Sequence, residues 1–353
     1  MDRSTICSWL TERDPARLQA LWDWADRVRA SGVGDAVHLR GLIEVSNYCV
    51  RDCSYCGLRR PRGGLPRYRL SEEEVMQAVR RAVEWGFGTV VLQSGEDPGL
   101  EAGWMRSLVT RIKKETSLAI TLSLGERRRD ELAAWRDSGA DRYLLKFETS
   151  NRELYRRIHP ERADEPGRLS LLAHLRDLGY EVGSGVMVGI PGQTFDDLSR
   201  DIELFGELDL DMISVGPFIP HPATPLGHEV LSANGVPGGS EVALAAMALT
   251  RIKCPRANIP TTTALSTLDV GAGLERGLNV GANVVMPNLT PPPYRQLYQV
   301  YPGKGGNGED PTTEPRRIIE RIRALGRCIG DGRGDAPKSW APAAAALVAE
   351  VRT

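Results

Sequence analysis

Three cysteines stand within eight residues of the segment SNYCVRDCSYCGLRR, residues 46–60. Cys49, Cys53 and Cys56 have the spacing C-x3-C-x2-C, and no fourth cysteine follows nearby. Iron–sulfur cubanes usually take four thiolates, and structural zinc usually takes four ligands. Three thiolates can hold three irons of one [4Fe–4S] cube. The fourth iron is then an open catalytic position at which a reactant binds.

The reactant that fits an open iron is S-adenosylmethionine (SAM), which chelates through its amino and carboxylate groups. An electron from the cluster can then break the adjacent sulfonium bond and give a 5′-deoxyadenosyl radical. Such chemistry belongs to the cofactor pair, while the protein positions and shields it. Tyr55 precedes the third cysteine, and we expect its ring beside the adenine, although it could simply pack in place. Structural zinc is the alternative, because a lone CxxC is often zinc-binding or redox-active.

The overall composition narrows the class of partner. The chain has 353 residues with 45 basic and 46 acidic side chains, so its formal net charge is −1. This balance predicts neither nucleic acid nor an anionic membrane as a partner. The start, MDRSTICSWLTERD, has no apolar signal core, and no apolar run is long enough to span a bilayer. We therefore expect a cytoplasmic protein, in which clustered cysteines bind metal rather than form disulfides.

Strand and helix patterns alternate along the chain. Apolar runs predict strands at 41–47, 89–94, 118–124, 141–148, 181–189, 212–218, 259–265 and 282–288. Helical patterns follow them at 71–86, 101–115, 128–138, 151–158, 167–178, 194–207, 240–253 and 271–277. Continuous apolar runs suit parallel strands buried on both faces, so the fold class is α/β and the prediction is a complete (β/α)8 TIM barrel. Polar residues gather at the strand ends, where such barrels carry their active sites.

Regions outside the barrel are predicted to be mainly helical. Residues 8–31 have a helical pattern, and the tail has a polar loop at 303–315, a helix at 315–327 and an Ala-rich final helix. The expected organisation is an N-terminal helical extension (1–36), the barrel (37–300) and a C-terminal loop with helices (301–353).

Over about residues 40–304 the sequence resembles a known family. Beside the cysteine loop, the segments VVLQSGEDP, TLSLGE, GADRYLLKFETSN, MVGIPGQT, GPFIPHPATPL, NIPTTTAL and GANVVMPNLTPPPYRQLYQVYPGK occur in one order. Together they are similar to the HydE maturases of [FeFe]-hydrogenase within the radical SAM superfamily, with biotin synthase and methylornithine synthase as more distant relatives. The resemblance implies radical attack at the sulfur of an iron–cysteine complex carrying CO and cyanide, towards the diiron part of the hydrogenase H-cluster.

The resemblance also implies roles for individual positions. Cys49, Cys53 and Cys56 match the cluster ligands, and Tyr55, Gly57, Ser94, Gly95, Glu96, Glu148, Arg168, Met286 and Tyr298 match positions around SAM. Within that set the backbone at 94–96 receives the methionine amino group, Glu148 contacts the ribose and amino region, and Arg168 faces the carboxylate. Gln93, Thr121, Ser123, Lys146, Thr261 and Thr262 match the substrate cavity, with polar barrel filling as the alternative reading of each.

Two departures from the family pattern bear on function. Gly306, Glu314 and Arg317 stand where many HydE proteins have cysteines for a second cluster, so we expect one cluster only. Lys146-Phe147 stands where we expect Arg-His; lysine keeps the charge but loses the bidentate geometry of arginine. The substrate could therefore differ from that of HydE.

Three functions remain open from the sequence. The first is a HydE-type radical enzyme, with a reducing donor such as ferredoxin or flavodoxin and possible contacts to other maturases. The second is a radical enzyme acting on an amino acid, such as a mutase like methylornithine synthase. The third is a non-catalytic iron–sulfur or zinc protein. A lysine-derived substrate would need carboxylates for its distant ammonium, and the predicted rim offers only Glu96, Asp97, Glu126 and Glu148, which favours an anionic substrate.

Overall fold

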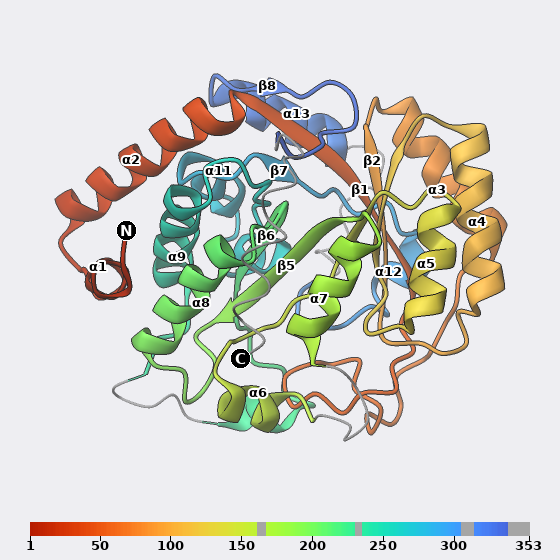
Figure 1. Cartoon of the computed structure of the whole chain (residues 1–353), viewed down its shortest axis with the longest axis horizontal. Coiled ribbons are helices and arrows are strands. Elements are labelled where there is room, and N and C mark those ends of the chain that lie inside the picture. Colours follow the sequence, from red (N-terminus) through yellow and green to blue (C-terminus); the bar gives the residue numbers. More distant parts are fainter. Residues whose placement is uncertain (161–166, 230–234, 305–313, 338–353) are drawn as a thin grey trace.

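A parallel β-sheet curves through the centre of the molecule, with helices on its outer side (Figure 1). The computed structural model describes residues 1–160, 167–229, 235–304 and 314–337. Its strands are β1 (Ala36–Ser46), β2 (Thr89–Ser94), β3 (Ala119–Ser123), β4 (Arg142–Leu144), β5 (Glu181–Val188), β6 (Met212–Pro217), β7 (Val284–Val285) and β8 (Cys328–Ile329). The order is β6-β5-β4-β3-β2-β1-β7, and β8 also pairs with β1. The described chain thus forms a half-barrel of seven parallel strands, which confirms the α/β class.

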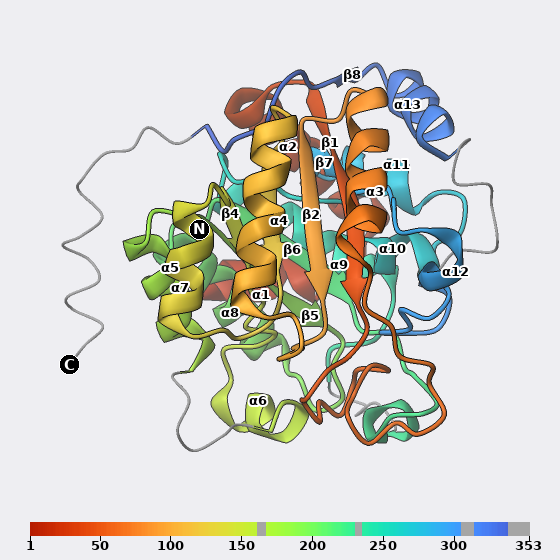
Figure 2. The same cartoon turned by 90° about the vertical axis from the view of Figure 1, so that its right-hand side faces the viewer.

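Helices connect the strands and cover the outer face of the sheet (Figures 1 and 2). They are α1 (Arg3–Leu10), α2 (Pro15–Val33), α3 (Glu72–Glu84), α4 (Ala102–Glu115), α5 (Arg129–Asp137), α6 (Arg152–Ile158), α7 (Arg168–Asp177), α8 (Phe195–Glu207), the 3-10 turn η1 (Pro225–His228), α9 (Ser240–Lys253), α10 (Thr263–Leu268), α11 (Gly273–Asn279), α12 (Pro292–Arg295) and α13 (Glu314–Ala324). Helix α1 packs on α8, and α2 packs on α9. Among the described helices, none is both long and apolar enough to cross a membrane.

Local sequence signals account for several of these elements. Ser71 and Glu74 form the predicted capping box at the start of α3, with each side chain accepting from the other residue's backbone N–H. Gly86 follows the helix with φ 71°, which is a conformation that glycine adopts without strain. β2 has the bounds that its apolar run predicts.

Four predicted elements differ clearly from the structure. The predicted strand 282–288 is reduced to the two residues of β7. Residues 8–31 form two helices, because Asp14 caps a new helix and Pro15 takes its first position, where proline is tolerated. The run 259–265 makes only isolated bridges, at Asn258 and Pro260, before α10 begins. Strand β4 ends at Leu144 instead of continuing to 148. The predicted Ala-rich final helix lies outside the described residues.

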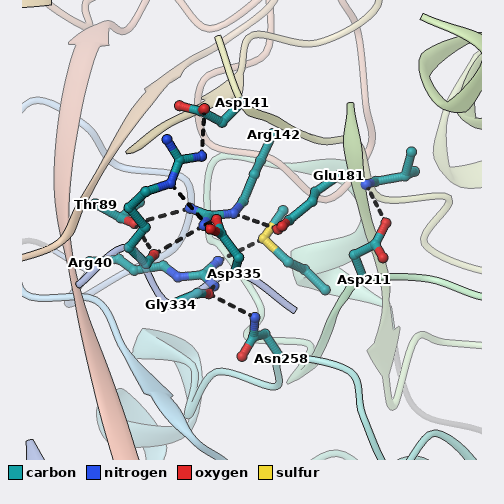
Figure 3. Close-up of polar contacts among 12 residues, drawn as sticks. Arg40, Thr89, Asp141, Arg142, Glu181, Asp211, Asn258, Gly334 and Asp335 are labelled. Atoms are coloured by element: carbon teal, nitrogen blue, oxygen red, sulfur yellow. Dashed lines mark hydrogen bonds and ion pairs between the residues drawn. The ribbon is translucent and has the colours of Figure 1, made fainter. Parts of the chain in front are cut away.

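The segment after β8 closes the N-terminal end of the sheet (Figure 3). Arg142 is fully buried there and donates to Glu181 (2.6 Å), to Thr89 (3.0 Å) and to the carbonyl of Arg333 (3.0 Å). It also forms an ion pair with Asp335. The carbonyl of Gly334 accepts from Arg40 and Asn258. These contacts cover the N-terminal ends of the strands. The C-terminal ends, at the opposite side of the sheet, are therefore the accessible face for a site.

Candidate active site

The three predicted cluster cysteines lie in the loop between β1 and α3. The backbone of this loop extends beyond the arrowheads of β1 and β2 (Figure 2). All three are free thiols; Cys53 is buried, and Cys49 and Cys56 are half-buried. Burial raises the pKa of each thiol, to about 12 for Cys56, and the charges of Cys56 and Cys49 raise the pKa of Cys53 further. Raised pKa values keep these cysteines as neutral thiols, so a bound cation such as an iron cluster would be needed to hold all three as thiolates.

Contacts to three distant segments fix the shape of this loop. Its backbone N–H groups donate from Val50 to Glu96, from Ser54 to Ile158 and from Gly57 to Val300. A Cβ on Gly57 would lie 2.0 Å from the carbonyl oxygen of Gln299, so only glycine allows this approach. Gly57, which we expected at the cofactor, therefore lies against the chain segment that contains Tyr298.

The segment Ser94-Gly95-Glu96 begins with the last residue of β2 and passes next to the cysteine loop. A Cβ on Gly95 would lie 2.3 Å from the carbonyl oxygen of Tyr48 and 2.8 Å from Cβ of Cys49. This close approach of two backbones requires glycine. It places the predicted amino-binding segment in contact with a cluster ligand.

A buried network of alternating charges joins this segment to the predicted carboxylate-binding arginine. Arg51 donates from Nε to Glu96 (2.6 Å) and from Nη2 to Glu126 (3.0 Å). The other oxygen of Glu96 accepts from the backbone N–H of Glu126 (3.0 Å). Burial raises the pKa of Glu96, and the Arg51 charge opposes that shift. Both oxygens of Glu96 thus accept hydrogen bonds, so its side chain links the cysteine loop to the segment that contains Glu126. Arg51 was not predicted from the sequence.

Arg168 lies at the start of α7 with its guanidinium enclosed on three sides. Nε donates to Glu126 (2.9 Å), Nη1 to the carbonyl of Lys146 (2.6 Å) and Nη2 to Nε2 of His159 (2.7 Å). Nη1 also lies 3.9 Å from Oε1 of Glu148. A guanidinium has five N–H groups. These three hydrogen bonds leave one N–H on each terminal nitrogen without a partner among the described residues, and a carboxylate can accept from two such donors.

Glu148 is the second carboxylate beside Arg168, after Glu126, and has an unusual backbone conformation. Its φ is 63°, which is uncommon for a residue other than glycine and concentrates at functional sites. Its side chain is buried, and Oε2 has no hydrogen-bond partner among the described residues. A buried, unpaired acceptor requires a donor. A hydroxyl or ammonium group of a bound molecule would supply it.

Three further predicted cofactor residues have clear surroundings. Tyr55 packs against an apolar cluster that includes Phe218 and Leu226, which agrees with the packing alternative as well as with a place beside adenine. Tyr298 is buried, and this burial raises the pKa of its hydroxyl. Met286 lines a cavity inside the sheet.

The predicted substrate residues are only partly brought together. Gln93 pairs in register with Ser123 on one side and with Glu44 on the other, so the three side chains face the same way. Thr121 lines the same cavity as Met286, and its Oγ1 has no partner among the described residues. These positions form one polar surface inside the half-barrel.

Thr261 and Thr262 have structural partners. Oγ1 of Thr261 donates to the carbonyl of Gly273 (3.3 Å), and Thr262 caps α10 by accepting from the N–H of Leu265 (3.2 Å). Either threonine hydroxyl could contact a substrate only in addition to its intramolecular hydrogen bond.

Lys146 lies after β4, two residues beyond Leu144, which lines the interior cavity, so alternation along the chain predicts an inward side chain. Its neighbour Phe147 points the other way and packs on Phe205 of α8, with ring centroids 5.6 Å apart. The Phe in place of the expected His therefore does not face the interior. The Lys146 side chain is half-buried and has no hydrogen bond or ion pair within the described part of the chain.

Two residues that the sequence analysis overlooked form a buried ion pair beside this surface. Glu44 of β1 pairs with Lys304, and both side chains are almost completely buried. Asn288 (3.2 Å) and Thr290 (3.3 Å) donate to the second oxygen of Glu44. An acid inside an apolar strand sequence was the available signal, because buried carboxylates are rare unless they are paired.

Comparisons with known proteins agree with this geometry. The profile of the Radical SAM superfamily matches residues 43–205, which contain the cysteine loop, Glu148 and Arg168. The crystal structure of methylornithine synthase (PylB) superimposes with a TM-score of 0.80 at 26% identity, over 93% of this chain and 94% of that chain. The fold and the site thus define a radical SAM enzyme.

Comparison with sequence relatives identifies the family within the radical SAM superfamily to which the chain belongs. The [FeFe] hydrogenase maturase subunit HydE of Thermotoga maritima is 47% identical over 93% of this chain and 92% of its own length. The 3-methylornithine synthase of Methanosarcina acetivorans is 30% identical over 88% of this chain and 85% of its own length. The chain belongs to the HydE family of radical SAM enzymes.

Proposed function

We propose that this chain binds one [4Fe–4S] cluster through Cys49, Cys53 and Cys56 and acts as a HydE-type maturase. The observation that carries the proposal is one loop with three free cysteines, near Arg168, which has two unused N–H groups, and Glu148, which has one unpaired oxygen. These groups match a metal cluster, a carboxylate and a hydroxyl or ammonium group. Identity of 47% to a HydE maturase supports the same conclusion.

The residues present fit SAM. Arg168 would receive the carboxylate, Glu148 the ribose and amino region, and the backbone at 94–96 the amino group. Tyr55, Gly57, Met286 and Tyr298 would complete the pocket. When bound, the cluster supplies the electron that cleaves SAM to methionine and a 5′-deoxyadenosyl radical. The protein would bind and orient the cofactor and exclude water from it. Burial of the cysteine loop contributes to the exclusion of water.

The charges inside the half-barrel support an anionic substrate such as an iron–cysteine complex with CO and cyanide. Lys146 has no partner within the described chain. Glu96 and Glu126 are paired with arginines, Asp97 is paired with Arg69, and Glu44 is paired with Lys304. Among the described rim acids Glu148 alone keeps an unpaired oxygen. Gln93, Thr121, Ser123, Thr261 and Thr262 would supply neutral hydrogen bonds around the anion.

The second candidate is a radical enzyme acting on an amino acid. Similarity to methylornithine synthase in sequence and fold favours it. A substrate with a distant ammonium group would need a free carboxylate of its own, and the one unpaired oxygen among the described rim acids, on Glu148, is assigned to SAM in this proposal. The charges around the interior therefore place this candidate function below the HydE-type function.

Further parts of the proposal concern architecture and partners. Isolated bridges from Met212 to Asn258 and from Pro260 to Val284 support closure of the sheet into an eight-stranded barrel. We place the barrel at 37–300, with extensions at 1–36 and 301–353. A reducing donor such as ferredoxin or flavodoxin would supply the electron in the cytoplasm, and other maturases would supply or accept the substrate.

Anaerobic reconstitution tests the proposal. The wild-type chain should bind about four irons, because the cluster loop supplies one set of three thiolates. Reduction in the presence of SAM should release 5′-deoxyadenosine and methionine, and Cys53→Ala should abolish both iron retention and cleavage. Co-expression with a [FeFe]-hydrogenase and the remaining maturases should give active hydrogenase. About eight irons per chain, or a Cys53→Ala variant with full iron and full cleavage, would contradict the assignment.

A further inference from the structure

His159 is a buried histidine beside the proposed SAM site that no step described above uses. It follows α6 directly, and its side chain is 1% exposed. Nε2 lies 2.7 Å from Nη2 of Arg168, and Nδ1 lies 3.1 Å from the hydroxyl of Tyr155. The imidazole also stacks on the Tyr155 ring, with centroids 5.0 Å apart and planes at 22°. Both ring nitrogens are therefore engaged.

The partners determine the protonation state of the ring. A guanidinium has donors only, so Nε2 must accept from Arg168. The ring proton then lies on Nδ1 and is donated to the Tyr155 hydroxyl oxygen. Burial, together with the charges of Arg168 and Arg51, lowers the pKa of His159 to about 2, so the ring stays neutral over the working pH range. His159 is thus a fixed neutral acceptor, held in orientation by Tyr155.

We propose that His159 is a positioning residue for SAM, which fixes Arg168 so that its two unused N–H groups face the SAM carboxylate. The proposal rests on the proposed function, in which Arg168 receives that carboxylate. Glu126 and the Lys146 carbonyl restrain Nε and Nη1, and His159 restrains Nη2. All three restraints are needed to orient a planar fork, because a carboxylate is bound in bidentate fashion only in that plane.

Loss of the acceptor has a specific consequence. Without Nε2, one N–H of a buried cation has no partner, and leaving it unpaired is costly. Glu126 already accepts from Nε, so the anion within reach that Arg168 does not yet hydrogen-bond is Glu148, whose Oε1 lies 3.9 Å from Nη1. The guanidinium would turn towards Glu148. That movement would occupy both the arginine and the carboxylate that the proposed SAM site requires.

Binding measurements on the anaerobically reconstituted full chain test this role. His159→Leu removes the acceptor, and we expect the Kd for SAM to rise at least tenfold. His159→Gln places an amide oxygen near the position of Nε2 and should restore the Kd to within about threefold of wild type. The Kd for 5′-methylthioadenosine, which has no carboxylate, should be unchanged in both variants. In an Arg168→Met background, His159→Leu should add no further loss of SAM affinity.

The outcomes separate the two proposals. A wild-type protein that does not bind SAM would contradict the proposed function itself. A wild-type protein that binds SAM, combined with an unchanged Kd in His159→Leu, would overturn the positioning role alone. Parallel loss of 5′-methylthioadenosine binding, or failure of His159→Gln to restore affinity when iron content and Tm are normal, would also overturn it.

Discussion

Lys304 and Glu44 form a buried ion pair that ties the chain segment after α12 to strand β1. The two residues are 260 positions apart in the sequence. The ammonium group of Lys304 also lies 4.8 Å from the ring centroid of Tyr298, over its face. The segment that contains Tyr298 in turn contacts the cluster loop at Gly57. The ion pair therefore fixes one wall of the candidate site.

Removing one partner of this pair should destabilise the protein strongly. We expect Lys304→Met to lower the free energy of unfolding by about 3–5 kcal/mol, because it leaves a buried carboxylate without its cation. The double variant Lys304→Met with Glu44→Gln should be more stable than Lys304→Met alone. Urea unfolding of the reconstituted protein measures both, with Lys114→Met on the exposed face of α4 as the control. Additive losses in the double variant would contradict the coupling.

Arg142 should be equally important at the opposite end of the sheet. Arg142→Met removes contacts to Glu181, Asp335 and the Arg333 carbonyl (Figure 3). We expect a loss of about 3–5 kcal/mol and earlier proteolysis of the segment after β8, because the buried cation holds that segment in place. The exposed Arg106→Met is the matched control. A Tm equal to that of the control would show that this closure adds nothing to stability.

Asp201 should make the stability depend on pH. It lies fully buried on α8, with Oδ1 accepting from the N–H of Ser150 (2.5 Å) and Oδ2 unpaired among the described residues. Burial raises its pKa from 3.8 to about 7. The folded state therefore holds a proton that the unfolded chain has released, and this contribution to stability decreases as pH rises from about 4 to about 7. Asp201→Asn should remove that slope, as Tm measured from pH 5 to pH 8 will show. An unchanged slope would mean that Asp201 titrates normally.

The sequence predicted those parts of the fold that local patterns determine. β2 and the capping box of α3 follow from an apolar run and from a Ser–Glu spacing, and both occur where expected. β4 is shorter than predicted; the segment after it contains the left-handed backbone of Glu148, which no propensity indicates. Thr262 caps a helix where a strand was expected, because a threonine favours both states.

In the candidate site, too, local sequence signals could be predicted and long-range contacts could not. The cluster cysteines follow from their own spacing, within one loop. The partners Arg51 and Lys304 meet their targets, 45 and 260 positions away, only after separate segments pack together. Arg142 and Asp335, for instance, are 193 residues apart. Local periodicity carries no information on such pairs, whereas an isolated charge in an apolar run, such as Glu44, does indicate that a partner exists.

Lys146 provides the sharpest test of the substrate. Its side chain is half-buried on the inner side of the half-barrel, and no acid pairs with it in the described chain. A cation in this position would attract the negative end of a carboxylate or of a cyanide-bearing complex. Lys146→Met keeps the apolar stem and removes the charge. We expect SAM cleavage without substrate to persist and substrate turnover to fall at least tenfold, a loss of about 1.4 kcal/mol or more.

Two measurements on one preparation decide the role of this lysine: 5′-deoxyadenosine released without substrate, and product formed with substrate. Lys146→Arg should retain most of the turnover, because it keeps the charge and matches the arginine expected at this position. Lys114→Met again serves as the surface control. Wild-type turnover by Lys146→Met would mean that the ammonium group binds no anion. Loss of cleavage together with turnover would instead assign Lys146 to the SAM pocket, where its carbonyl already contacts Arg168.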